Sequence, residues 1–364
     1  MILPTLALGG METITCNLAV QLAIRGHTVG ITCLESEGGP LAFQLRDAGI
    51  ELRLVPCPGV RPNILPDPLL KSHFESRSRD VVHTHNGVWA KAAVAARAAN
   101  VPVVVNTLHG FALGEPRYYD ALRWWASRYT AHIAAVSEPL RHHLITSSKV
   151  PSAKISVLPN GIDTARFAPG KEDGSLRRRL GLSGTTPLVG CIARLDPVKN
   201  HATLISAFAR VSMLCPQAHL VLIGDGPLRG ELEKQVRTMG LGDTVHFTGE
   251  FADPASLYRA LDLFALASLY EGTSISILEA LASGVPVIAT NVGGNCALLE
   301  IGRCGLLVPP NDSQALADAI ASVLLNPRLG QKLAASGRDW VTSAYSLEAM
   351  VQKYESIYYK LLNK

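Results

Sequence analysis

The sequence of 364 residues contains no apolar run close to the roughly 20 residues that a membrane-spanning helix needs. Its first residues also lack the basic and then apolar layout of a signal peptide. No low-complexity tract occurs, and hydrophobic residues make up 48% of the chain against 18% charged residues, which is typical of a folded globular protein. We therefore expect a cytoplasmic protein. A chain of this length exceeds the usual size of a single core, which favours two domains.

Two further absences concern disulfides and metal ions. The seven cysteines are scattered and form no C-x-x-C pair; they stand at positions 16, 33, 57, 191, 215, 296 and 304. An odd, scattered set argues against a disulfide framework and against a cysteine zinc site, so we interpret the cysteines as small buried side chains. No Asp-x-Asp motif occurs either, so we expect no carboxylate-held metal and no cofactor.

The net charge of +4 is unevenly distributed. Residues 1–160 hold 15 Lys and Arg against 11 Asp and Glu, whereas the rest of the chain holds 19 of each. The excess indicates either an anionic partner for the first half or an ordinary solvated surface, and charge alone favours the second. No feature of the sequence points to nucleic acid.

Short β-branched runs alternate with helix-length amphipathic segments, which predicts parallel sheets with helices on both faces. The runs of the first half are 2–7, 28–34, 51–56, 81–85, 101–108, 132–136 and 155–158. The rhythm then restarts, with runs 188–193, 220–223, 245–248, 263–267, 285–289 and 305–308. The fold class is therefore α/β, with two doubly wound, Rossmann-like domains in succession.

Turn-forming residues separate the two series of strands. Pro159-Asn160-Gly161-Ile162-Asp163 and the polar stretch 169–174 form the best linker in the chain. We place the boundary near 165, which gives an N-terminal domain of residues 1–165 and a C-terminal domain of residues 166–345. The closing segment 347–362 is one long helical pattern, and packing of residues 346–364 back on the first domain is left open.

The strongest chemical signal follows the run that ends near Ala267. Glu271 comes before a predicted helix and Glu279 lies within it. The turn Gly272-Thr273-Ser274, together with Ile275, presents backbone N–H groups at the helix N-terminus, which suits anionic oxygens. Glu279 suits vicinal hydroxyls such as those of ribose. On spacing alone, two unrelated surface carboxylates explain the pair equally well.

The run 188–193 delivers a second cluster. Arg194 follows the strand and Lys199 stands at the start of the next helix. The guanidinium of Arg194, with its paired N–H donors, and the ammonium group of Lys199 could together hold a diphosphate. Without a metal, a diphosphate donor would be neutralised by these cations. The alternative is a solvated loop with a capping role.

The remaining candidates are glycine-rich turns and one histidine. Gly9 and Gly10 open the first helix, where a phosphate or an acceptor oxygen fits, although a simple tight turn explains them nearly as well. His109 follows the run 101–108 and is a hydrogen-bonding candidate, whereas a lone histidine is more often structural. His83 and His85 look like scaffold. Gly224-Asp225-Gly226-Pro227 resembles a dinucleotide motif only superficially, because the third glycine comes one residue late.

Taken together and in their order along the chain, these motifs resemble those of the family 4 retaining glycosyltransferases of the GT-B fold, whose two domains face each other across a cleft. The resemblance runs nearly the whole length, and its members are Gly9-Gly10, Arg25-Gly26-His27-Thr28-Val29, His109-Gly110, Ala135-Val136-Ser137, Pro159 to Asp163, Arg194 with Lys199, Gly224 to Pro227, Glu271 with Glu279, Val292-Gly293-Gly294 and Gly305 to Pro310.

The resemblance implies a role for each candidate. Arg194 and Lys199 would bind the diphosphate of a nucleotide sugar, Glu279 the ribose, and Glu271 the transferred sugar, with the N–H groups of 272–276 assisting. His109 would reach the donor sugar from the other domain, Gly10 would also lie at the donor, and the base would be held near Gly249 and Glu250. Such enzymes retain configuration by front-face attack, so no dedicated nucleophile is needed.

The implied activity is transfer of a hexose-type sugar from a UDP- or GDP-sugar to a cell-envelope acceptor, such as a lipid-linked saccharide, a glycolipid or a polysaccharide precursor. A nucleotide-sugar epimerase of the same fold and a catalytically silent scaffold that binds envelope components remain alternatives. Two departures from the family pattern stand out. The first strand is short, so we expect that the true start lies upstream of Met1 or that this edge is weak, and Cys296-Ala297-Leu298 stands where a polar residue is common.

A membrane contact is the last expectation. Aromatic residues interleave with Arg117, Arg123 and Arg128 in the segment 117–129, as in helices that lie at a bilayer surface. We expect peripheral binding of the first domain to the anionic inner leaflet, with an ordinary packing helix as the alternative.

Overall fold

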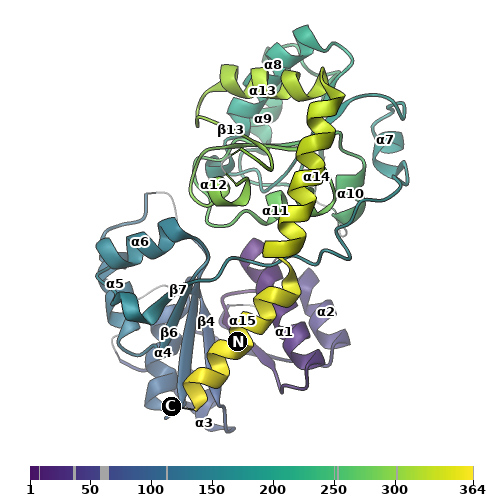
Figure 1. Cartoon of the computed structure of the whole chain (residues 1–364). Coiled ribbons are helices and arrows are strands. Elements are labelled where there is room, and N and C mark those ends of the chain that lie inside the picture. The colour runs from purple at the N-terminus through teal and green to yellow at the C-terminus, as the bar shows by residue number, and fades with distance from the viewer. Residues whose placement is uncertain are drawn as a thin grey trace. The chain divides into compact units, whose positions relative to one another are not determined.

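The computed structural model describes residues 1–364 except 8, 36–37, 58–64, 112–113, 250, 252–253, 301 and 364. The chain divides into two units, one made of Met1–Gly161 with Leu347–Lys364 and the other of Ile162–Ser346. The sequence placed the boundary near 165, a few residues beyond this change of unit. Each unit is built on one sheet of parallel strands flanked by helices (Figure 1).

The sheet of unit 1 has the strand order β3-β2-β1-β4-β5-β6-β7. The strands are β1 (Ile2–Leu3), β2 (Gly30–Cys33), β3 (Glu51–Leu54), β4 (Val81–His85), β5 (Val103–Leu108), β6 (His132–Ala135) and β7 (Ile155–Val157). Each strand lies within a run that the sequence predicts. β1 is shorter than predicted: its pairing ends before Pro4, which has no backbone N–H to donate to a neighbouring strand.

Helices connect these strands and cover the sheet. They are α1 (Gly10–Ile24), α2 (Pro40–Asp47), α3 (Pro68–Glu75), α4 (Trp89–Ala98), α5 (Tyr118–Ser127) and α6 (Glu138–Thr146), with the 3₁₀ turn η1 (Ser152–Lys154) before β7. β5 is buried along its whole length, as expected for a central parallel strand.

The final helix, α15 (Leu347–Leu362), has the bounds that the sequence pattern gives, and it belongs to unit 1. It lies beside α1 (Figure 1). Glu355 accepts hydrogen bonds there from Arg25 Nη1 at 2.9 Å and from His27 Nε2 at 2.6 Å. The motif that contains Arg25 and His27 therefore anchors this helix.

The sheet of unit 2 has the strand order β10-β9-β8-β11-β12-β13. The strands are β8 (Leu188–Ile192), β9 (His219–Ile223), β10 (Val245–Gly249), β11 (Leu263–Leu266), β12 (Val287–Thr290) and β13 (Leu306–Val308). The order reverses between β8 and β11, so the loops that follow these two strands flank the switch point where doubly wound sheets bind ligands.

The helices of unit 2 bury its apolar sheet on both faces. They are α7 (Ser175–Arg179), η2 (Pro197–Lys199), α8 (His201–Leu214), α9 (Arg229–Thr238), α10 (Ala255–Arg259), α11 (Ile275–Ala282), α12 (Asn295–Leu298), α13 (Ser313–Leu324) and α14 (Pro327–Ala344). Phe208, Phe264 and Tyr258 are fully buried in this core. A rigid sheet of this kind holds the loops at its carboxyl edge in fixed positions.

Candidate active site

Glu271 lies in the loop between β11 and α11, and its carboxylate is held by two donors. Glu271 Oε1 accepts hydrogen bonds from Lys199 Nζ at 2.7 Å and from Ser268 Oγ at 2.6 Å. The side chain is only 8% exposed, so the ion pair with Lys199 is largely shielded from water. Two residues that the sequence predicts for the site, far apart along the chain, thus meet at the switch point.

The backbone of Glu271 is fixed by the glycine pair after β12. Gly294 N–H donates to the carbonyl oxygen of Glu271 at 3.2 Å. Gly293 has φ +51°, and an added Cβ would overlap that carbonyl oxygen and lie 2.9 Å from its carbon. The motif Val292-Gly293-Gly294 therefore lets one loop pack directly against the backbone of the loop that carries Glu271.

Glu279 lies in α11 and is buried against α10. Tyr258 OH donates to Glu279 Oε2 at 2.7 Å. Burial, together with the neighbouring Glu279 carboxylate, holds the pKa of Tyr258 well above its usual range, so the hydroxyl keeps its proton and remains a donor. Sequence reasoning missed Tyr258, because its contact with Glu279 arises only from helix packing.

Arg194 and Lys199 lie on the loop after β8, where Asp196 connects them. Asp196 Oδ2 accepts from Arg194 Nε at 2.7 Å, and Asp196 Oδ1 caps η2 by accepting from Lys199 N–H at 3.3 Å. The side chain of Arg194 is 72% exposed, so its guanidinium is available to solvent and ligands. Leu269 N–H donates to Val198 O at 2.8 Å, which ties the β8 loop to the β11 loop.

The loop Gly224-Asp225-Gly226 packs on the loop that carries Arg194. Gly224 has φ +138°, and an added Cβ there would overlap Ala193 O. At Gly226 an added Cβ would lie 2.5 Å from Leu195 O, and Leu195 N–H donates to Asp225 O at 2.9 Å. The glycines thus allow two loops to approach closely, and this contact accounts for the motif without a dinucleotide.

The turn before α11 supplies the backbone groups that the sequence predicts. Ser274 is the N-cap residue and makes no side-chain cap, while Thr273 and Ser274 are buried and Ile275 begins the helix. Gly249 ends β10 with φ +75°. Glu250, predicted to lie near the base, is outside the described residues.

Gly10 and His109 belong to unit 1, whereas the residues described above belong to unit 2. Gly10 begins α1, and Glu12 lies in the first turn of that helix. The carboxylate of Glu12 occupies the space where a Cβ on Gly9 would stand. The negative charge of this carboxylate would repel a second anion at the same helix N-terminus. Binding of an anionic donor near Gly10 therefore stays a prediction and would have to overcome this repulsion.

His109 follows β5 and is held through both its ring and its backbone. His109 Nε2 lies 3.0 Å from His85 Nδ1, and Asn86 Oδ1 accepts from His109 N–H at 2.8 Å. Among the described residues, the buried Nδ1 of His109 has no hydrogen-bond partner. Burial lowers the pKa of His109 to about 3, so its imidazole is neutral at physiological pH.

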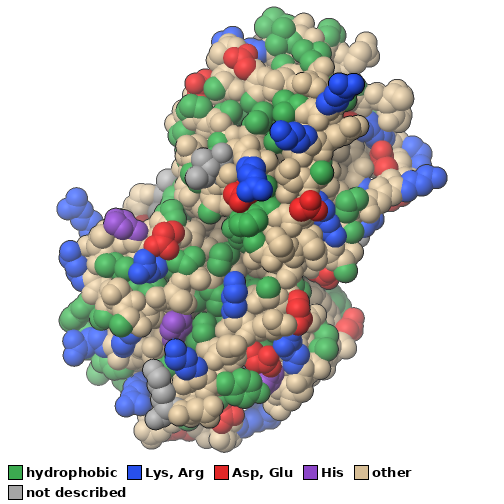
Figure 2. All heavy atoms as spheres, viewed as in Figure 1, with side chains coloured by type: hydrophobic (Ala, Val, Ile, Leu, Met, Phe, Trp, Pro, Cys, Tyr) green, Lys and Arg blue, Asp and Glu red, His purple; other side chains and the backbone are tan. Residues whose placement is uncertain are grey.

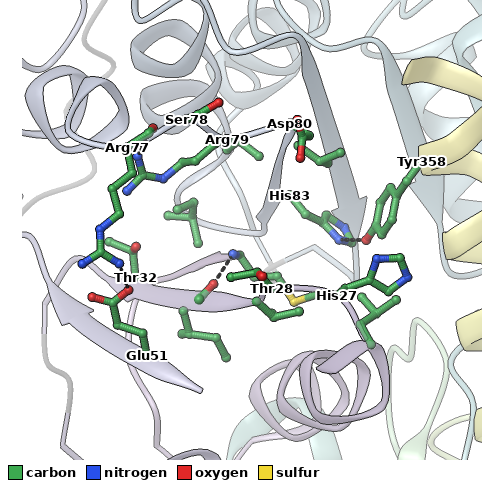
Figure 3. A pocket seen from close by; sticks show the side chains of 18 of the residues that line it. His27, Thr28, Thr32, Glu51, Arg77, Ser78, Arg79, Asp80, His83 and Tyr358 are labelled. Carbon is green, nitrogen blue, oxygen red and sulfur yellow. Dashed lines mark hydrogen bonds and ion pairs between the residues drawn. The ribbon is translucent and has the colours of Figure 1, made fainter. Parts of the chain in front are cut away.

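A cavity of about 490 Å³ lies at the opposite edge of the sheet of unit 1 (Figure 3). It is lined by the amino ends of β2 and β4 and by Met1, and Arg77 and Arg79 come from the segment before β4. The cavity lies between the amino ends of β2 and β4, in line with β1, a strand of only two residues that pairs with both of them. None of the predicted site residues that the structure describes lines it.

Arg123, one of the three arginines that interleave with aromatic residues in the segment 117–129, does not face the solvent. Arg123 is buried and forms ion pairs with Glu115 and, at 3.2 Å, with Asp120, and its guanidinium lies 4.4 Å from the ring centre of Phe111. It therefore fixes the segment before α5 instead of facing outward. Arg117, Tyr118, Trp124 and Arg128 do remain exposed on this helix and at its ends.

In the described part of the chain, no three His, Cys, Asp or Glu side chains lie close enough together to hold a metal ion. Nor does this part contain a helix long and apolar enough to cross a bilayer.

Comparison with known proteins assigns the family. The family described as Glycosyl transferases group 1 matches residues 173–340, and Glycosyltransferase Family 4 matches residues 8–166. A GDP-mannose-dependent alpha-(1-6)-phosphatidylinositol monomannoside mannosyltransferase of Mycolicibacterium smegmatis is 31% identical over 297 residues, which are 76% of this chain and 76% of that protein. The chain belongs to the family 4 glycosyltransferases of group 1.

Two further matches cover nearly the whole chain, one in sequence and one in structure. An Escherichia coli UDP-Gal:alpha-D-GlcNAc-diphosphoundecaprenol alpha-1,3-galactosyltransferase is 28% identical over 96% of this chain and 94% of its own. The structure of Anabaena HepE in complex with UDP-glucose matches with a TM-score of 0.86 at 23% identity, covering 98% of this chain and 97% of that one. The predicted family and the predicted GT-B fold are thereby confirmed.

Proposed function

We propose that this glycosyltransferase moves a hexose-type sugar from a UDP- or GDP-sugar to a cell-envelope acceptor, with retention of configuration and without a metal ion. The observation that carries the proposal is the cluster at the switch point of unit 2. There the loops after β8 and β11 bring Lys199 into an ion pair with Glu271, close to the exposed guanidinium of Arg194. Cations, a buried carboxylate and a helix N-terminus meet at one sheet edge, as an anionic nucleotide sugar requires.

Each residue then has a chemical task. Arg194 and Lys199 neutralise the diphosphate as its bond to the sugar breaks, which stabilises the charge that develops on the leaving group. Glu279, oriented by Tyr258, accepts hydrogen bonds from the ribose hydroxyls. The N–H groups of 272–275 and the carboxylate of Glu271 hold the transferred sugar, and His109 contacts the same sugar. These roles remain predictions.

Retention follows from attack on the face from which the diphosphate leaves. The bond between the anomeric carbon and the phosphate oxygen breaks, and a bond to the acceptor oxygen forms on the same face. The acceptor proton moves to the departing phosphate oxygen. This route uses no protein nucleophile, and the cations take the place of a metal ion in neutralising the two phosphates.

The envelope acceptor is supported by the named relatives. The E. coli protein acts on a diphosphoundecaprenol-linked sugar, and the M. smegmatis protein on a phosphatidylinositol monomannoside. A Rhizobium meliloti relative is a lipopolysaccharide core mannosyltransferase. Since these relatives use both UDP- and GDP-linked donors, the base has to be determined by experiment.

The decisive experiment measures thermal stabilisation by UDP, GDP, ADP and their sugars with a chelator present. A ligand at 100 times its Kd stabilises the folded protein by about 2.7 kcal/mol. We expect one nucleotide to raise the Tm selectively, and we expect Arg194→Ala, Lys199→Ala and Glu279→Ala to abolish the shift. Arg237→Ala, which removes an exposed arginine of α9, is the matched control and should keep it.

The outcomes separate the proposal from its alternatives. Transfer of labelled sugar to extracted envelope lipid or glycan, with an unchanged anomeric configuration by NMR, supports it. Conversion of the donor without any acceptor would indicate an epimerase. The absence of a response to every nucleotide sugar would contradict the donor site.

We also propose that unit 1 binds an anionic bilayer through α5. Arg128 lies 5.2 Å from the ring centre of Trp124, and both are exposed together with Tyr118 and Arg117. Figure 2 shows Lys and Arg side chains at several points on the side of unit 1 where α5 and α6 lie. An aromatic side chain flanked by arginines is the arrangement that seats a helix at a lipid headgroup layer.

A further inference from the structure

His85 and His109 stand at the carboxyl ends of two neighbouring strands. β4 and β5 pair in parallel with His85 opposite Thr107, so the side chain of His109, two residues further on, lies within reach. The two rings are 5.3 Å apart at 29°, and His85 Nδ1 lies 3.0 Å from His109 Nε2. One hydrogen must lie between these nitrogens, and its position decides what His109 offers to a ligand.

Both imidazoles are neutral, since burial lowers the pKa of each well below its ordinary value. A neutral imidazole carries one N–H and one acceptor nitrogen. If His85 donates from Nδ1, His109 accepts at Nε2 and must carry its own hydrogen on Nδ1. If His109 donates from Nε2, its Nδ1 is an acceptor.

Thr15 favours one of these two arrangements. Its hydroxyl donates to Met11 O at 2.8 Å, which uses its single hydrogen. Thr15 Oγ1 also lies 3.3 Å from His85 Nδ1 and 3.5 Å from Nε2, and towards both it has only lone pairs left to offer. The shorter distance favours a hydrogen on His85 Nδ1, which then faces two acceptors, Thr15 Oγ1 and His109 Nε2. A hydrogen on Nε2 instead would meet Thr15 only at the longer distance and would leave the lone pair of Nδ1 facing that oxygen.

We propose that His85 is a positioning residue that fixes His109 as the Nδ1–H tautomer, so that His109 presents a hydrogen-bond donor to an oxygen atom of the bound substrate. The inference rests on the proposed function, in which His109 contacts the transferred sugar. It adds the direction of that hydrogen bond: the sugar offers a lone pair, such as that of a hydroxyl oxygen. The buried Nδ1–H gains a partner only when substrate is bound.

The rest of the sheet holds His85 in place. His83 stacks on His85 with ring centres 4.4 Å apart, and its own nitrogens contact Tyr358 OH and Thr107 Oγ1, each at 2.7 Å. Tyr354 OH lies 2.8 Å from the same Thr107 oxygen. Both tyrosines come from α15, so the last helix of the chain braces the stack of histidines behind His109.

The consequence is selectivity at one substrate oxygen. A buried donor left unpaired is unfavourable, so a deoxy sugar that lacks the partner oxygen is bound about tenfold or more less well. If Nδ1 of His109 were an acceptor instead, the sugar would have to donate the hydrogen of a hydroxyl group.

The test reads the tautomer directly, by long-range ¹H–¹⁵N NMR of the whole protein with ¹⁵N-labelled histidine. Loss of one set of ring signals in His109→Ala assigns the residue. We expect the Nδ1–H pattern for His109 in the unmodified protein and a change to Nε2–H in His85→Leu. In His85→Asn an amide N–H takes the place of Nδ1–H and should keep the original pattern.

The measurement needs neither donor nor acceptor, so its outcome is independent of whether sugar transfer is found. An Nε2–H pattern for His109 in the unmodified protein would overturn the inference whether or not the two His85 variants fold. His132→Asn, which alters a histidine of β6 bonded to Ser156, is the matched control and should leave the His109 signals unchanged. In transfer assays His85→Leu should lower kcat/KM about tenfold, with recovery in His85→Asn, whereas a purely structural role predicts no such recovery.

Discussion

Replacing Gly293 with alanine tests whether the glycine pair positions Glu271. The new Cβ would overlap the carbonyl oxygen of Glu271, and the residue would have to keep φ +51°, where side chains other than glycine cost about 1–2 kcal/mol. The two loops would have to separate by about 1 Å or more to restore ordinary contact. That separation also weakens the hydrogen bond from Gly294 N–H to Glu271 O, worth about 0.5–1.5 kcal/mol.

The sum is a loss of about 1.5–3.5 kcal/mol in the unfolding free energy of unit 2. For a unit of this size each kcal/mol lowers the Tm by about 2–4 °C, so we expect a fall of about 3–14 °C by calorimetry. A displacement of 1 Å at a catalytic carboxylate costs about 100-fold in rate, so transfer should fall further than stability explains.

Gly230→Ala is the matched control for this change. Gly230 lies in α9, and nothing lies within 4 Å of a Cβ added there. Alanine is the better helix former by up to about 1 kcal/mol, so this variant should be as stable as the original or slightly more so. A Gly293→Ala protein with unchanged Tm and unchanged donor affinity would refute the role of the glycine pair.

Three further predictions concern other contacts. Tyr258→Phe removes the hydrogen-bond donor to Glu279 Oε2 and should lower the unfolding free energy by about 1.5–3 kcal/mol in denaturant titrations. The same variant should bind the nucleotide more weakly in calorimetry, and equal values for the variant and the unmodified protein would count against the prediction. The unfolding free energy should fall between pH 7.5 and pH 5.5, because His83 and His85 stay neutral in the folded protein but are protonated near pH 6.5 in the unfolded chain. This difference costs about 1.4 kcal/mol for each histidine at pH 5.5, and a Tm that does not change with pH would contradict the prediction. Trp124→Ala should weaken sedimentation with anionic vesicles at low salt, and no binding by the unmodified protein would end the idea of a bilayer contact.

The sequence predicts every strand of the described structure, because most of these parallel strands are buried and therefore appear as short apolar runs. β4 has the predicted bounds, whereas β12 begins at Val287, two residues later than expected. Gly284, with φ +73°, and Pro286 lengthen the turn before that strand. Strand ends depend on such local turns, which periodicity does not resolve.

The sequence also predicts which loops carry charged residues, but not how these residues pair. Lys199 and Glu271 appear as separate candidates, and their ion pair exists only because β8 and β11 are neighbours at the switch point. Ser268 and Tyr258 had no signal of their own, since a serine after a strand and a tyrosine in a short helix are common. Arg123 is paired within unit 1, and Asp120, three residues earlier, was a visible partner in the sequence.

The glycines of unit 2 connect these observations. The loop after β9 can approach the loop with Arg194 only because positions 224 and 226 have no side chain, and the loop after β12 can approach Glu271 only because position 293 has none. A glycine motif in this fold therefore marks a loop that supports the charged residue next to it. Because each such contact is between backbones, it fixes the position of the backbone but not the direction of the side chain. The side chain of Arg194 is directed by its ion pair with Asp196, and that of Glu271 by its ion pair with Lys199. Mutations at these glycines should therefore resemble mutations of the charged residues in their effect on transfer, while differing from them in their effect on stability.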